Sequence, residues 1–320
     1  MINRLNKKNL LLLILLCLNI SILFFYAYIH IINVDEREHL YASYLVHNGY
    51  LPYRDFFEHH HPLLWYTFAP FLHFFDNTPY IWYIIRTFSL VLIFGCAYLV
   101  YKITNLLSEN KITAFTAAIF YTGFDIIHYS GTEFRPDNLM ILLFLSGLYY
   151  YFKYDKQKKC IFLALSYTLF FLSFFALQKN LFMLIALGIM MIYSTIKEKQ
   201  PYRPIFLALL LPLGLTACYI FYLYHNHALK DYFELNWLIY LYRKIDYSYI
   251  DWERCIIPVI GMICIFLPNT KKIPHINIIN ILYITELTKL LLFDTSSGQH
   301  LLTLYPFLAI ILATFLYQYK

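Results

Sequence analysis

Long runs of apolar residues separated by short polar segments form the main pattern of this chain. The first run, Leu10–Ile32, is too long for the core of a signal peptide and lacks a small-residue cleavage site, so it predicts an uncleaved first membrane span. Nine further spans are predicted at about Tyr80–Ile103, Ile112–Tyr129, Leu139–Phe152, Cys160–Leu177, Leu181–Ile196, Ile205–Tyr224, Cys255–Leu267, Ile276–Phe293 and Leu301–Tyr319. The apolar segment Leu63–Phe75 is shorter, and we expect it to lie in the membrane interface. The pattern therefore predicts an all-α integral membrane protein, a polytopic bundle of about ten transmembrane helices with interfacial helices in the first outer loop.

The composition agrees with this fold class. Hydrophobic residues make up 60% of the chain and charged residues only 14%, against about 25% charged in an ordinary globular protein. Such a chain cannot cover itself with polar surface, so we expect the lipid bilayer to be its solvent and expect no nucleic-acid partner for its net charge of +6. The six cysteines show no C-x-x-C spacing, which favours buried apolar side chains over a disulfide or zinc framework. No soluble domain is apparent, so residues 1–320 are predicted to form one multispanning domain.

Basic residues predict which side of the membrane each segment occupies. The segments predicted to be cytoplasmic, both termini included, contain 15 Lys and Arg residues, against eight in the outer loops. Two strongly basic segments, Lys153–Lys159 and Lys197–Arg203, enclose two apolar runs, so the turn at Gln178–Asn180 should be the tip of a helical hairpin. The polar clusters then meet on the extracytoplasmic side; they are the loop 33–79, Glu133–Asp137, Gln178–Lys179, His225–Arg254 and Gln299–His300.

The outer loop 33–79 contains most of the reactive side chains. Asp35 directly follows the first span, and Glu38 stands three residues later. This spacing fits a capping box at a helix start. It equally fits a carboxylate that takes a proton from an attacking hydroxyl or amine. Both roles remain open for Asp35.

Further along the loop, Glu58 precedes three consecutive histidines, His59, His60 and His61. Asp35, Glu58 and His60 could together bind a divalent metal cation, which would offset the charge of a leaving phosphate. Adjacent histidines cannot all point in one direction, however, and neither H-x-x-x-H nor H-E-x-x-H occurs. Hydrogen bonds from the histidines to a substrate, or a simple interfacial role, are the alternatives.

Two cations in other outer turns, Arg135 and Lys179, are candidates for binding a phosphate. Lys179 could instead anchor the hairpin tip among lipid headgroups, and Asp137 could simply pair with Arg135. Glu286 and Lys289, one helical turn apart inside a predicted span, most simply neutralise each other; a proton or ion path is the alternative.

The order of these motifs resembles that of the polyprenol-dependent, multispanning (GT-C) glycosyltransferases, which include protein O-mannosyltransferases and lipid A aminoarabinose transferases. The resemblance rests on the segments Asp35–Glu36, Gly49–Tyr66, Phe134–Asn138, Gln178–Lys179 and Gln299–Pro306. It implies transfer of a sugar from a polyprenyl-phosphate donor to a lipid, glycan or protein acceptor. The chain departs from the pattern at Glu38, where relatives often have a basic residue, and Arg37 stands one place earlier.

The resemblance also implies roles for single residues. Asp35, Glu36 and Glu58 would be catalytic, and Arg37 would join Arg135 and Lys179 at the donor phosphate. The remaining substrate-binding residues would be His59, His60, His61, Asp137, Gln178, Gln299 and His300. A transporter or flippase for a lipid-linked sugar, or an inactive binding subunit, is the alternative. A transporter should contain internal repeats with charges near the middle of the membrane, a pattern that this sequence does not show.

Overall fold

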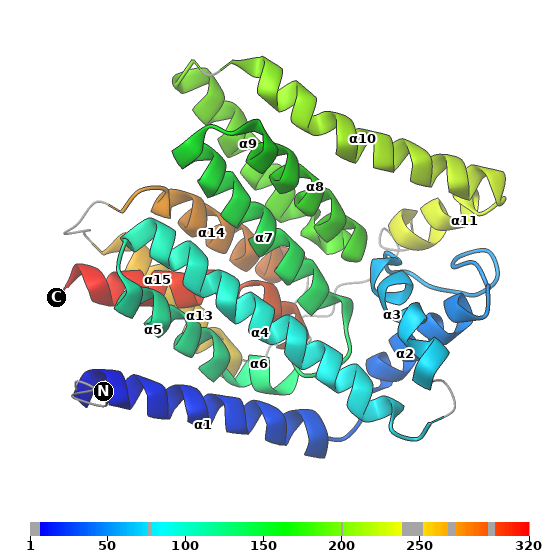
Figure 1. Ribbon diagram of the computed structural model, residues 1–320, viewed down its shortest axis with the longest axis horizontal. Helices are drawn as coiled ribbons and strands as arrows, with labels where there is room; N and C mark the ends of the chain where they lie inside the picture. Colours follow the sequence, from blue (N-terminus) through cyan, green and yellow to red (C-terminus); the bar gives the residue numbers. More distant parts are fainter. Residues whose placement is uncertain are drawn as a thin grey trace. The chain divides into compact units, whose positions relative to one another are not determined.

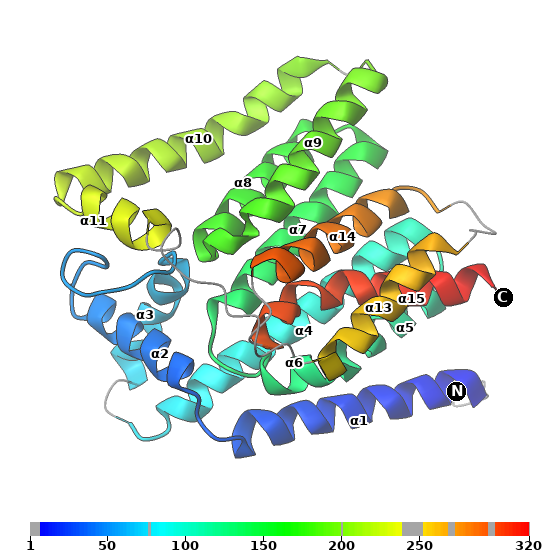
Figure 2. The ribbon, with the colours of Figure 1, turned by 180° about the vertical axis from the view of Figure 1, so that it is seen from behind.

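The computed structural model describes residues 7–75, 78–199, 201–238, 252–267, 273–293 and 298–319, and their regular secondary structure is entirely helical (Figures 1 and 2). Contacts divide the chain into two compact units. The first comprises Met1–Ile31, Arg86–Glu133 and Asp246–Lys320, and the second comprises Ile32–Ile85 and Phe134–Ile245. The all-helical class is confirmed, and each unit joins segments that lie far apart in the sequence.

The first unit is organised around its last helix. α15 packs against α5, α13 and α14, while α1 packs against α5 and the short α6. Close contact is possible because small residues face their neighbours: a side chain at Gly261 would collide with Tyr283 and Leu308. The helices of this unit are α1 (Lys7–Ile29), most of α4 (Ile81–Ser108), α5 (Lys111–Gly123), α6 (Asp125–Tyr129), α13 (Trp252–Phe266), α14 (Ile276–Phe293), η3 (Gly298–Thr303) and α15 (Tyr305–Gln318).

The charged residue Arg86 lies inside a predicted membrane span, where its charge is balanced by backbone carbonyl oxygens. Its guanidinium is buried and donates to the carbonyl oxygens of Ala27, His30 and Ile31, at 2.8 to 3.1 Å. These carbonyls lie at the C-terminal end of α1, where a helix leaves its acceptors without partners and presents the negative end of its dipole. Arg86 therefore caps α1.

The charges inside α14 are likewise paired. Lys289 Nζ contacts Glu286 Oε2, and the hydroxyl of Thr303 donates to the same carboxylate oxygen. All three side chains are buried. The prediction that Glu286 and Lys289 neutralise each other is confirmed.

The second unit contains the helices on both sides of the predicted hairpin. α7 and α8 form its largest interface, where Ser166 Oγ donates to the Gly147 carbonyl at 2.8 Å. The predicted turn at Gln178–Asn180 is confirmed as a 3-10 turn, η1, between α8 and α9. Figures 1 and 2 show α7, α8 and α9 side by side. The elements are α2 (Val34–His47), α3 (Leu63–Phe75), α7 (Pro136–Gln157), α8 (Cys160–Ala176), η1, α9 (Leu181–Lys197), α10 (Tyr202–His225), α11 (Leu229–Phe233) and the π-helical turn η2 (Glu234–Leu238).

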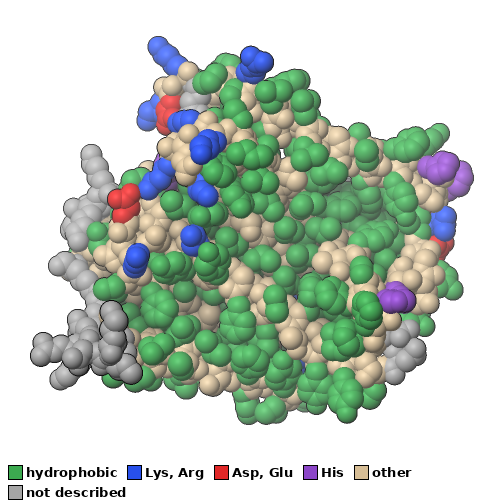
Figure 3. All heavy atoms as spheres, in the orientation of Figure 1, with side chains coloured by type: hydrophobic (Ala, Val, Ile, Leu, Met, Phe, Trp, Pro, Cys, Tyr) green, Lys and Arg blue, Asp and Glu red, His purple; other side chains and the backbone are tan. Residues whose placement is uncertain are grey.

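Four helices in the described part of the chain are long and apolar enough to cross a membrane: Asn9–Ile29, Ile81–Ser108, Gln178–Lys197 and Tyr202–His225. The ten predicted spans are therefore confirmed only in part. The predicted span Ile112–Tyr129 is in fact broken, because α5 ends at Gly123 and α6 begins at Asp125. Large apolar side chains cover much of the surface in Figure 3, including exposed residues of α9 and α10.

None of the five cysteines whose side chains are described forms a disulfide. The expectation that they are buried is correct for Cys96 and Cys264 but wrong for Cys17, Cys160 and Cys218, which are exposed on apolar helices. An exposed apolar residue is common on a helix whose whole surface is apolar. The hydropathy of an apolar run therefore does not predict which of its residues are buried.

Candidate functional site

The second unit brings the reactive side chains of the outer loop together with those of α7 and η1, starting from the first turn of α2. The N-cap of α2 is Asn33, whose side chain accepts from the backbone N–H of Asp35 at 3.4 Å. Glu36 completes the capping box by accepting from the N–H of Asn33 at 3.1 Å. The predicted capping box of Asp35 and Glu38 is therefore wrong by two residues, and Asp35 lies in the first helical turn instead.

Glu36 also ties α2 to the segment that begins α7. Its second carboxylate oxygen accepts from the N–H of Phe134 at 3.2 Å, and the side chain is fully buried. Both oxygens are thus occupied by backbone donors. Glu36 therefore fastens α2 to the start of α7, and its expected catalytic role stays a prediction.

Asp35 begins a chain of alternating charges that runs to the hairpin tip. Arg135 Nη1 donates to Asp35, Arg135 Nε lies 3.5 Å from Asp137, and Lys179 Nζ contacts the other oxygen of Asp137. Arg135 and Asp137 are buried, whereas Asp35 is 35% exposed and Lys179 22% exposed. The two ends of this chain, a carboxylate and an ammonium group, are therefore the members that a substrate can reach.

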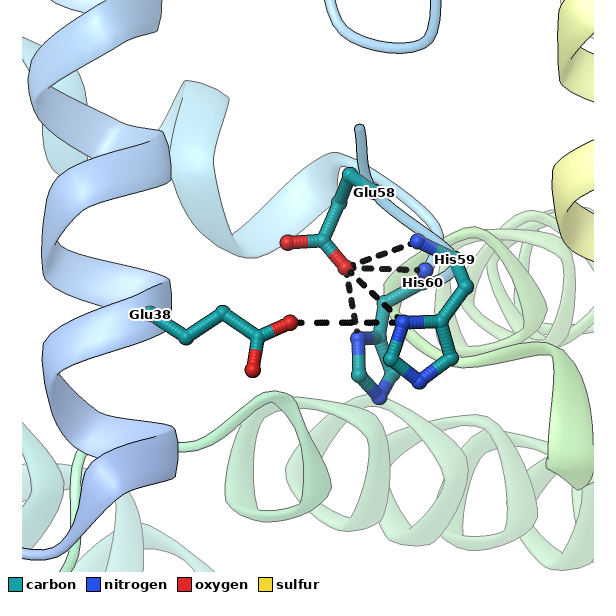
Figure 4. A group of neighbouring side chains, drawn as sticks. All are labelled: Glu38, Glu58, His59 and His60. Atoms are coloured by element: carbon teal, nitrogen blue, oxygen red, sulfur yellow. Dashed lines mark hydrogen bonds and ion pairs between the residues drawn. The ribbon is translucent and has the colours of Figure 1, made fainter. Parts of the chain in front are cut away.

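A second cluster combines two carboxylates with two imidazoles (Figure 4). Glu58 is buried, and its Oε1 accepts from His60 Nδ1 at 2.8 Å and from the backbone N–H of His59 at 2.8 Å. Glu38 approaches from α2, with its Oε1 4.0 Å from His59 Nδ1. One ligand atom from each of these four residues lies within 4.8 Å of all the others.

The electrostatics of this cluster suit a cation. Burial, and after it the neighbouring Glu58 carboxylate, raise the pKa of Glu38 above its usual range. A positive charge between the two carboxylates would relieve their mutual repulsion. Carboxylate oxygens and imidazole nitrogens are ligands that zinc and manganese accept. Glu38, Glu58, His59 and His60 are therefore the residues that could hold a divalent metal ion, and the expected set of Asp35, Glu58 and His60 shares two of them.

His61 has a different environment from the two histidines before it. It is fully buried, with Nδ1 2.7 Å from the Phe174 carbonyl and Nε2 3.1 Å from the Tyr232 hydroxyl. Burial lowers the pKa of His61 to about 4, so the ring is neutral, with Nδ1 donating and Nε2 accepting. His61 holds the loop against α8 and α11, and its expected contact with a substrate stays a prediction.

Gln178 fastens the same loop to the hairpin tip. Its amide nitrogen donates to the His59 carbonyl at 2.5 Å, and its amide oxygen accepts from the N–H of His61 at 3.2 Å. The histidine loop and Lys179 are thus joined through adjacent residues. Gln178 connects the two segments, and its expected role in binding substrate stays a prediction.

The remaining expected site residues are Arg37, Gln299 and His300. Arg37 is exposed and donates to the Ile32 carbonyl at 3.4 Å. Gln299 and His300 belong to η3 in the first unit, so their contribution stays a prediction. Much of the predicted outer loop His225–Arg254 falls outside the described residues.

Two buried or half-buried residues of α2 were not assigned to the site from the sequence. Glu38 belongs to the cluster that could hold a cation, and its position one turn after Asp35 was the available signal. His39 is buried, stacks with Trp65 and accepts from its indole N–H at 3.3 Å. Burial lowers the pKa of His39 well below its usual range, so this ring is neutral as well.

No protein-family model matches the chain, and no curated protein matches it. The function of the site must therefore be argued from its own geometry.

Proposed function

We propose that the protein is a membrane glycosyltransferase that moves a sugar from a polyprenyl-phosphate donor to an acceptor on the extracytoplasmic side. The observation that carries the proposal is the half-exposed Asp35 carboxylate, held by the buried Arg135 at one end of a charge chain whose other end is the accessible Lys179. A base and two cations in one network match the needs of a reaction with a nucleophilic hydroxyl or amine and a phosphate leaving group.

In this reaction the acceptor attacks the anomeric carbon of the donor sugar. The bond from that carbon to the phosphate oxygen breaks, and its electron pair leaves with polyprenyl phosphate. Asp35 takes the proton that the acceptor loses. Because Arg135 is paired with Asp35, a phosphate that enters beside the accessible Lys179 and attracts Arg135 would loosen this pair and free the carboxylate to act as a base.

The residues that could hold a metal ion fit next to this network. Asp35 and Glu38 lie one turn apart on α2, so the two clusters are next to each other. A bound divalent cation would supply positive charge near the departing phosphate. Glu58 and His60 would hold it, with Glu38 and His59 close enough to complete the set.

The test is a transfer assay with the purified full-length protein, radiolabelled polyprenyl-phosphate sugars and membrane extracts as acceptors. Asp35→Asn keeps the size of the side chain but removes the base, so transfer should fall by roughly 10²- to 10⁴-fold. Glu234→Gln, which changes an exposed carboxylate in the same unit, is the matched control. Unchanged transfer by a folded Asp35→Asn protein would remove Asp35 from the mechanism. Absence of transfer from every donor tested would contradict the glycosyltransferase itself.

A further inference from the structure

Two basic segments lie at one end of the second unit and make its surface there strongly positive. The segments Lys153–Lys159 and Lys197–Arg203 are here called the basic end. They contain seven basic and two acidic side chains, a net charge of +5. Most of the basic side chains are exposed, and Figure 3 shows a group of Lys and Arg atoms at the ends of these helices.

The fold brings the two segments together. A small pocket at this end is lined by residues from four helices: Tyr154 and Asp155 of α7, Tyr167 of α8, Thr195 of α9 and Ile205 of α10. Each of these helices either ends or begins beside a basic segment. Two basic segments about 40 residues apart in the chain therefore lie at the same end of this unit, where their positive charges repel one another unless an anionic partner compensates them.

Several of the lysines are held over aromatic rings. Lys153 Nζ lies 4.5 Å from the ring centre of Phe162, Lys158 Nζ lies 5.6 Å from that of Tyr154, and Lys197 Nζ lies 5.6 Å from that of Tyr193. Of the two acidic residues, Asp155 pairs with Lys158 at 2.6 Å and Glu198 accepts from Ser194, and the two segments together keep a net charge of +5. The ammonium groups are thus fixed in place without losing their charge.

The surface beside this rim is apolar and exposed. On α9, one stripe presents Ile185, Ile189, Ile192 and Ile196, and on α10 the first turns expose Phe206 and Leu207. Both helices are among those long and apolar enough to cross a membrane. An exposed apolar face that ends in lysines and in the exposed rings of Tyr193 and Tyr202 is the arrangement expected where a helix leaves the hydrocarbon for the headgroup layer.

We propose that the basic end binds the headgroups of anionic phospholipids. A zwitterionic headgroup brings no net charge to compensate +5, whereas an anionic headgroup supplies a phosphate within reach of the lysines while its acyl chains cover the isoleucine stripe of α9. Each basic side chain close to an anionic membrane surface contributes about a five-fold preference. The surface therefore selects anionic lipids from the bilayer around it.

The preference can be measured with spin-labelled lipids and the full-length protein in phosphatidylcholine membranes. Spin-labelled phosphatidylglycerol should associate with the wild type several-fold more strongly than spin-labelled phosphatidylcholine, and salt should weaken the preference. The triple variant Lys156→Gln, Lys159→Gln and Lys199→Gln removes three exposed charges and leaves the ring-held lysines in place. In this variant the preference for phosphatidylglycerol over phosphatidylcholine should fall by up to about five-fold for each charge removed.

Lys230→Gln is the control, because Lys230 is 83% exposed but lies in α11, away from the basic segments. It should keep most of the preference. An equal preference in the wild type and the triple variant, or no preference in the wild type, would overturn the proposal. Complete displacement of the anionic lipid by millimolar inorganic phosphate would also overturn it, since the surface would then be a site for free phosphate.

Discussion

Asp137 is the residue that decides how the two candidate phosphate-binding cations can act. Its buried carboxylate contacts Arg135 through one oxygen and Lys179 through the other. A cation held by a buried carboxylate is fixed in position but has part of its charge compensated. The two cations are therefore coupled, and a change at either one alters the electrostatics of the other.

Removing the accessible end of this network should impair transfer more than stability. Lys179→Gln loses one charge-assisted contact to the phosphate, roughly 1.5–3 kcal/mol, so donor turnover should fall about 10- to 150-fold. Combining it with Asp137→Asn should cost less than the two separate losses together, because the residues share one network. Transfer rates and donor KM, with Lys230→Gln as control, measure this. Wild-type kinetics for Lys179→Gln would leave Lys179 as a headgroup anchor only.

His61 should make the stability of the protein depend on pH. The pKa of His61 is about 4 in the folded protein, whereas the unfolded chain takes up a proton near its ordinary value of 6.5. Between these values the unfolded state binds more protons, so stability falls as the pH falls from 6.5 to 4, by up to about 1.4 kcal/mol per pH unit. The buried neutral His39 acts in the same direction.

Melting temperatures at pH 7.5 and 5.5 test this dependence. His61→Asn should be less stable than the wild type at pH 7.5 but should lose less stability on acidification. His225→Asn, at an exposed histidine of α10, should leave the difference between the two pH values unchanged. An identical acid-induced loss in the wild type and His61→Asn would contradict the buried neutral state of His61.

At the scale of elements, the loop between α2 and α3 is held by hydrogen bonds within the loop and by one to the end of α10. The Asp55 carboxylate accepts from the N–H of Leu51 at 2.7 Å, and the Tyr53 hydroxyl donates to the His60 carbonyl at 2.8 Å. Arg54 reaches the Asn226 carbonyl at the end of α10, at 3.3 Å. The loop therefore presents Glu58 and the histidines from a braced framework.

This framework should bind a divalent metal ion. After incubation with zinc or manganese and removal of the excess, the purified protein should retain about one ion, measured by elemental mass spectrometry. Glu58→Gln should lower the retained metal at least about ten-fold, in the range expected when one ligand is lost, and His60→Ala should do the same. His225→Ala is the control. No retained metal in the wild type, or equal retention in Glu58→Gln, would exclude a metal role for the cluster.

At the scale of the whole molecule, the predicted topology separates the basic end from the charge chain. In a background without the six native cysteines, Asn48→Cys and Lys230→Cys should react with an impermeant thiol reagent added outside intact cells. Gln157→Cys and Arg203→Cys should not react, because the basic segments are predicted to be cytoplasmic. All four positions are exposed, so burial cannot account for a lack of reaction. Reaction of the second pair alone would invert the topology and place the candidate site on the cytoplasmic side.

The sequence alone determined the helical class, the helical hairpin and the pairing of Glu286 with Lys289. Apolar periodicity and charge spacing act over one or two helical turns, so they can be followed along the chain. The same local rules placed a helix start near Asp35 but missed the Asn33 cap. Asn, Asp and Glu all suit such positions, and only the backbone geometry selects among them.

Only the tertiary structure decided which charges share a site. Arg135 meets Asp35 across 100 positions of the chain, and Gln178 meets the His59 carbonyl across 119. The tertiary structure also places three adjacent histidines in two environments. His61 is buried against α8 and α11, whereas His59 and His60 lie beside the carboxylates of Glu38 and Glu58. Adjacent residues in a loop have nearly the same sequence neighbours, so a local pattern cannot tell them apart. Their burial depends on which distant helices pack against each side chain.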